Sequence, residues 1–177
     1  MQVRIIDTVA RDSFHEVFNA ALLVMCLRLC GRAEYHCHPS QRRCLEQLLE
    51  RHGYAEELSR VAFRSVRVVR REGPAGWVCR YATAALRSGW RLVRSQPDEL
   101  VVFNYNNPLA LPLLNLLNRM LHRRVLIVCH GELELLAGSH PWWRASGWFA
   151  RILRRTFGRK RLDRNMRFCV LGQSILR

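Results

Sequence analysis

Short apolar runs rich in β-branched residues alternate along this chain with longer stretches that repeat apolar residues at helical spacing. Runs of the first kind predict strands, and stretches of the second kind predict amphipathic helices. The strands are expected at residues 3–8, 33–37, 62–69, 99–104, 124–129 and 166–171. The helices are expected at 13–29, from Pro39 to Gly53, and at 77–93, 108–122 and 142–157.

Strict alternation of strands and helices with short connections is typical of an α/β fold. Parallel strands need helical crossovers, and right-handed crossovers place helices on both faces of the sheet. The chain is therefore predicted to form a doubly wound, mainly parallel, Rossmann-like sheet. No repeat or low-complexity linker divides it, so we expect a single lobe over residues 1–177.

The composition is that of a folded, basic protein with an anionic partner. Hydrophobic residues make up 49% and charged residues 24%, and 29 Lys and Arg face 14 Asp and Glu for a net charge of +15. Nucleic acid, an anionic membrane and a phosphorylated substrate all carry the negative charge that such a partner needs. The longest apolar stretches, 20–30 and 108–121, are interrupted by polar residues and are shorter than the roughly 20 residues that span a bilayer. With no secretory leader and an odd number of cysteines, seven, we expect reduced thiols and a cytoplasmic protein.

Several nucleotide and metal motifs are missing from the sequence. It contains no phosphate-binding P-loop and no Gly-x-Gly-x-x-Gly, which argues against a P-loop nucleotidase and a dinucleotide dehydrogenase, and it contains no Asp-x-Asp. His36, Cys37, His38 and Cys44 cluster, but on a strand Cys37 points away from both histidines. We therefore predict neither a metal site nor a cofactor.

Polar residues follow several predicted strands, at the sheet edge where α/β proteins bind ligands. Asn104 and Asn106 follow the fourth strand, and Ser174 follows the last. Such residues also cap helices and form turns, so a structural role is an equal alternative at each loop. His130 and Glu132 are needed neither to cap a helix nor to form a turn. The tripeptide His130-Gly131-Glu132 is therefore the favoured functional candidate.

Three of these strand ends resemble the N-terminal lobe of bacterial glycosyltransferases of the two-lobed B fold (GT-B), of the retaining type found in polysaccharide assembly. The matching segments are VLIVCHGELE at 125–134, VVFNYNN at 101–107 and CVLGQSIL at 169–176. In that family the N-terminal lobe binds the acceptor and the C-terminal lobe binds the sugar nucleotide.

The resemblance implies that the chain is the acceptor-side lobe of a hexosyltransferase for a saccharide or lipid-linked acceptor. His130 would be the catalytic residue beside the transferred sugar, with Glu132, Gly131, Asn104, Asn106 and Ser174 as substrate-binding residues. We expect this sequence to lack the C-terminal donor-binding lobe. A second lobe would then have to hold the nucleotide sugar beside His130. We expect the chain to be inactive alone, as a fragment of an enzyme.

An aromatic and basic segment, 142–161, allows two interpretations. In the first, the segment is a helix that packs its apolar stripe on the sheet and turns its basic face to solvent. The alternative is an interfacial helix on an anionic membrane, which would place the protein at the inner face of the cell membrane. The residues of this membrane-surface hypothesis are Trp142, Trp143, Arg151, Arg154 and Arg155.

The alternative function is a basic, non-enzymatic α/β module that binds nucleic acid or an anionic membrane. The high pI of about 11.0 favours it. The sequence has neither a helix-turn-helix nor an RNP-type aromatic strand, and its arginines are scattered over most of the chain, which argues against nucleic acid as the partner.

Overall fold

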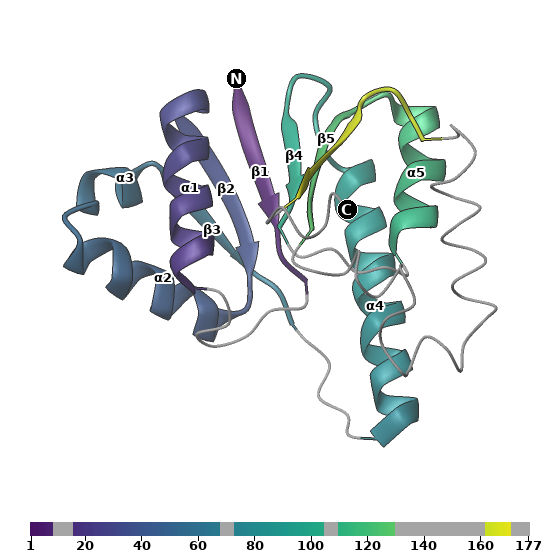
Figure 1. Cartoon of the computed structure of the whole chain (residues 1–177), viewed down its shortest axis with the longest axis horizontal. Coiled ribbons are helices and arrows are strands. Elements are labelled where there is room, and N and C mark those ends of the chain that lie inside the picture. Colours follow the sequence, from purple (N-terminus) through teal and green to yellow (C-terminus); the bar gives the residue numbers. More distant parts are fainter. Residues whose placement is uncertain (9–15, 68–72, 105–109, 130–161, 171–177) are drawn as a thin grey trace.

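The computed structural model describes residues 1–8, 16–67, 73–104, 110–129 and 162–170, which build a six-stranded sheet (Figure 1). The order across the sheet is β3-β2-β1-β4-β5-β6, and all neighbouring strands are parallel. This order confirms the predicted doubly wound α/β fold. The strands are β1 Gln2–Ile6, β2 Arg32–Cys37, β3 Val61–Ser65, β4 Leu100–Phe103, β5 Arg124–Cys129 and β6 Met166–Val170.

Helices cover both faces of the sheet, and each face has its own apolar core. In β1, Val3 and Ile5 belong to the core beneath α1 and α2, whereas Ile6 belongs to the core beneath α4 and α5. Figure 1 shows α1, α2 and α3 on one side and α4 and α5 on the other. The described helices are α1 Glu16–Cys30, α2 Pro39–Arg51, α3 Ala55–Ser59, α4 Gly73–Val93 and α5 Ala110–Leu121.

Predicted and observed elements agree closely, apart from one short helix and the ends of some elements. Helix α3 was not predicted, because its five residues are too few to show a helical period. Helix α4 begins at Gly73, four residues before the predicted start, since proline is tolerated in the first turn of a helix. Strand β3 ends at Ser65 instead of residue 69. The predicted helix 142–157 lies outside the described residues.

Local sequence explains why α2 starts directly after β2. His38 is the single residue between them, and its Nδ1 accepts a hydrogen bond of 3.2 Å from the Ser40 backbone N–H. Pro39 occupies the first helical position, where its missing N–H costs nothing. The helix ends before Gly53, whose φ of +80° favours glycine.

Within the described part of the chain, no helix is long and apolar enough to cross a membrane.

Candidate functional site

The strand order reverses between β1 and β4, and this reversal defines the candidate site. In open α/β sheets, ligands bind beyond the carboxyl ends of the strands at such a point. Asp7 and Thr8 follow β1, and Asn104 follows β4. Their backbones continue the sheet, because the Asp7 N–H donates to the His36 carbonyl (2.8 Å) and the Asn104 N–H to the Ile6 carbonyl (3.0 Å).

Asn104 is the centre of a buried hydrogen-bond network at this edge. Its Nδ2 donates to Asn19 Oδ1 (2.8 Å), to the Tyr35 hydroxyl (3.0 Å) and, at a longer distance, to Asp7 Oδ2 (3.4 Å). All four residues are buried. The amide therefore connects β4 to β1, β2 and α1.

A second amide reaches the same carboxylate from helix α2. Gln41, in the first turn of α2, is fully buried and donates through Nε2 to Asp7 Oδ2 at 3.1 Å. On the other face of the sheet, the hydroxyls of Thr8 and Ser88 lie 3.2 Å apart, which links the end of β1 to α4. Helices of both faces thus contact the two residues that follow β1.

Burial raises the pKa of the Tyr35 hydroxyl and of the Cys37 thiol, and both groups are protonated at neutral pH. Burial raises the pKa of Tyr35 well above its usual range, and the nearby Asp7 charge adds to this, although the hydrogen bond with Asn104 opposes it. Burial also raises the pKa of Cys37 to about 12, with a further contribution from Asp7. The Tyr35 group is therefore a neutral phenol, and the Cys37 thiol is not a nucleophile.

The network is a structural feature of this edge, because its five side chains are buried and hydrogen-bonded to one another. It combines a carboxylate, three amides and a phenol, which both donate and accept hydrogen bonds. Because these groups are buried and bonded to one another, they fix the ends of β1 and β4 relative to each other. Strand β5, which leads into His130, pairs with β4 and carries its carboxyl end to the same edge of the sheet.

One of the predicted site residues is described, and it lies in the network. Asn104 follows β4 as predicted and is fully buried. The other candidates, which are His130, Gly131, Glu132, Asn106, Ser174, Trp142, Trp143, Arg151, Arg154 and Arg155, lie outside the described residues.

Sequence reasoning missed the buried polar residues that the structure brings to this edge beside Asn104. Asp7 was included in a strand, although a carboxylate at a strand end is a usable signal. Asn19, Gln41 and Ser88 are single polar residues on the buried faces of helices. An isolated polar residue in a helical pattern does not reveal whether it faces water or another polar group.

The cluster of histidines and cysteines around β2 is divided as predicted. Cys37 belongs to the core beneath α1 and α2, whereas His36 lies on the opposite face, with Nε2 at 2.6 Å from Glu34 Oε1 and Nδ1 beside the Arg91 guanidinium. His38 caps α2. Across the described ranges, no group of three or more His, Cys, Asp or Glu could hold a metal ion.

No family model matches this chain, and neither curated proteins nor solved structures show a significant match to it.

Proposed function

We propose that this chain is the acceptor-side lobe of a glycosyltransferase that moves a sugar from a nucleotide sugar to a saccharide or lipid-linked acceptor in polysaccharide assembly. The observation that carries the proposal is the Asn104 network at the reversal of strand order. Asn104 lies in one of the three segments that resemble the GT-B glycosyltransferases. The first five residues of a second such segment, 125–129, lie in β5, which pairs with β4.

In this proposal each strand end has a separate task. His130 is beside the transferred sugar, and Gly131, Glu132, Asn106 and Ser174 contact acceptor hydroxyls. The buried Asn104 amide is a positioning group for the residues that follow β4. The nucleotide sugar is held by a second lobe facing this edge, and the enzyme works in the cytoplasm at the inner face of the membrane.

Acceptor binding by the chain alone tests the proposal. Saturation-transfer NMR with a panel of oligosaccharides should detect binding by the wild type and its loss in His130→Ala and Glu132→Gln. The matched control is His52→Ala, because His52 is an exposed histidine directly after α2, at the edge of the sheet opposite the carboxyl ends of the strands. The proposal is wrong if no saccharide binds, or if the control loses binding as fully as the two site variants.

Turnover by the chain alone is a separate measurement. Incubation with UDP-sugars and an acceptor that binds should release no UDP, because the donor is held by another lobe. Release of UDP would contradict the assignment of the chain to the acceptor side only.

A further inference from the structure

Helices α4 and α5 expose an unusual amount of apolar surface. They lie side by side on one face of the sheet (Figure 1). Monomeric soluble proteins rarely expose large contiguous apolar patches, and such patches mark contact surfaces. Five large side chains on these helices are exposed, namely Leu86 (68%), Trp90 (60%), Val93 (41%), Leu116 (61%) and Met120 (73%).

The five side chains form one patch, because the two helices pack closely at Gly89. A Cβ added at Gly89 would lie 3.0 Å from Leu113 Cδ2 and 3.1 Å from Leu117 Cδ1 of α5. With about 100° of rotation per residue, Leu86, Trp90 and Val93 fall on the solvent side of α4 next to this contact. The same geometry places Leu116 and Met120 on the solvent side of α5 next to Leu113 and Leu117. We call these five residues the α4–α5 patch.

The charged side chains on α4 and α5 have a single sign. Neither α4 nor α5 contains an Asp or a Glu. Arg119 on α5 is exposed, and Arg94 follows α4 directly, with its guanidinium carbon 5.2 Å from the centre of the Trp90 ring. The other arginines of α4 whose contacts are described face elsewhere, because Arg87 donates to the Arg67 carbonyl and Arg91 contacts His36. A partner of this surface must combine an apolar layer with negative charge.

We propose that the α4–α5 patch docks on the surface of an anionic lipid bilayer. Trp90 would lie at the level of the lipid headgroups, with Arg94 on its ring and Arg119 of α5 facing lipid phosphates. Leu86, Leu116 and Met120 would enter the boundary between headgroups and acyl chains. The inference goes beyond sugar transfer and does not depend on it. It is also independent of the aromatic and basic segment 142–161, which lies outside the described residues.

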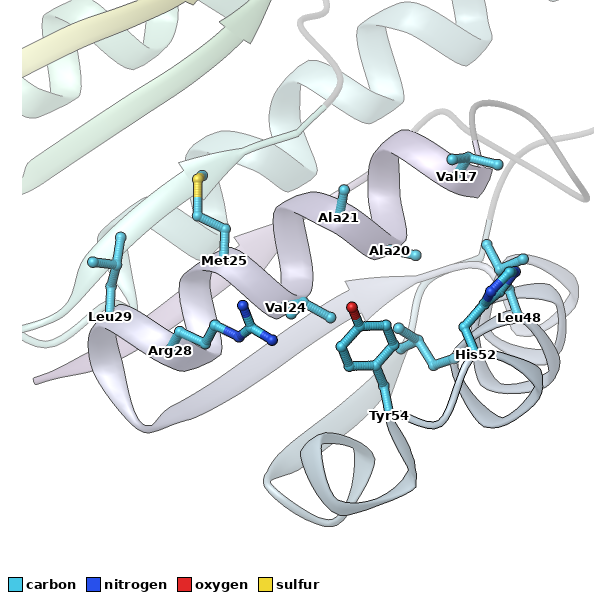
Figure 2. A pocket seen from close by; sticks show the side chains of 11 residues that line it. Val17, Ala20, Ala21, Val24, Met25, Arg28, Leu29, Leu48, His52 and Tyr54 are labelled. Atoms are coloured by element: carbon cyan, nitrogen blue, oxygen red, sulfur yellow. The ribbon is translucent and has the colours of Figure 1, made fainter.

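A second exposed apolar surface, on α1, supplies the control. There a groove of about 520 Å³ runs between α1 and α2, and Val17, Met25 and Leu29 line it (Figure 2). Arg28 and His52 are the basic residues of its lining. Leu29 is 74% exposed, almost the same as Met120 at 73%. A glutamate at either position therefore makes the same chemical change at the same exposure.

Co-sedimentation of the full chain with vesicles tests the proposal. The wild type should bind vesicles of phosphatidylglycerol mixed with phosphatidylcholine. It should bind vesicles of phosphatidylcholine alone much less. Met120→Glu and Trp90→Glu should each lower binding by about tenfold, which is the expected effect of losing one large buried apolar side chain. Leu29→Glu should bind as the wild type does. Circular dichroism of each variant verifies that its helices are intact.

Four results would overturn the proposal. The wild type could fail to bind anionic vesicles, or it could bind neutral vesicles equally well. Leu29→Glu could weaken binding as much as Met120→Glu does. Size-exclusion chromatography could show that the wild type is a dimer and Met120→Glu a monomer, in which case the α4–α5 patch is a contact between two copies of this chain. Because no step uses a sugar or a nucleotide, failure of this test leaves the proposed sugar transfer untouched and bears only on where the enzyme works.

Discussion

Replacement of Asn104 by alanine removes the amide that joins four secondary-structure elements at the carboxyl edge of the sheet. The substitution deletes the donor to Asn19 Oδ1 at 2.8 Å and to the Tyr35 hydroxyl at 3.0 Å. The Asp7 carboxylate keeps its bond from Gln41 at 3.1 Å. The substitution therefore removes at least two short, buried hydrogen bonds and one long one.

The expected cost follows from the number of bonds lost. Deleting one partner of a buried hydrogen bond costs about 1–2 kcal/mol, so Asn104→Ala should lower the free energy of unfolding by about 2–4 kcal/mol. Asn104→Asp has nearly the same shape but places a second carboxylate beside Asp7, at the position now 3.4 Å from its Oδ2. Since donors become acceptors and like charges meet, it should destabilise the fold more than alanine does at pH 7.

Urea denaturation monitored by far-ultraviolet circular dichroism measures both effects. The slope of the free energy against urea should stay at the wild-type value if only the native state changes. A loss below about 0.5 kcal/mol for Asn104→Ala would refute the reasoning, because ordinary surface substitutions cost that much. Equal stability of the two variants at pH 7 would refute the assignment of Asn104 Nδ2 as the donor to Asp7.

Two further predictions concern packing and pH. Gly89→Leu should destabilise the fold by about 1–3 kcal/mol, because a Cβ at this position already lies 3.0 Å from a side chain of α5. Gly53→Ala should cost about 1–2 kcal/mol through its φ of +80° alone, because no atom lies within 4 Å of the new Cβ. Thermal unfolding of both variants compares the steric cause with the backbone cause. Burial raises the pKa of Cys26 to about 11 and that of Cys37 to about 12, so the folded state retains protons that the unfolded state releases above about 9. Stability should therefore fall as the pH rises from about 9 towards 12, and both thiols should resist iodoacetamide at pH 8 in the native state, as peptide mass spectrometry can verify. Rapid native labelling of Cys37, or stability that does not change over this alkaline range, would contradict the burial of the thiols.

The alternation of apolar periods was sufficient to predict the class of fold. Helical and strand periods are local properties, so runs such as those of β5 and α5 are legible within 6 to 12 residues. The ends of elements were less well predicted, because they depend on caps and turns. Residue 104 was identified for the same local reason, since a polar residue directly after a strand lies at the ligand-binding edge of any parallel sheet.

The strand order and the partners of Asn104 were decided by the tertiary structure. A right-handed crossover permits the next strand to be added on either side, so the sequence does not state that β4 pairs with β1 or that the order reverses there. Asn19 and Gln41 acquire their role because α1 and α2 bring them to the ends of β1 and β4. The α4–α5 patch likewise depends on which helices pack together. Sequence alone determined the elements, the class of fold and the sign of the charge; packing between distant segments decided the polar network and the exposed apolar surface, because both depend on contacts that no local period encodes.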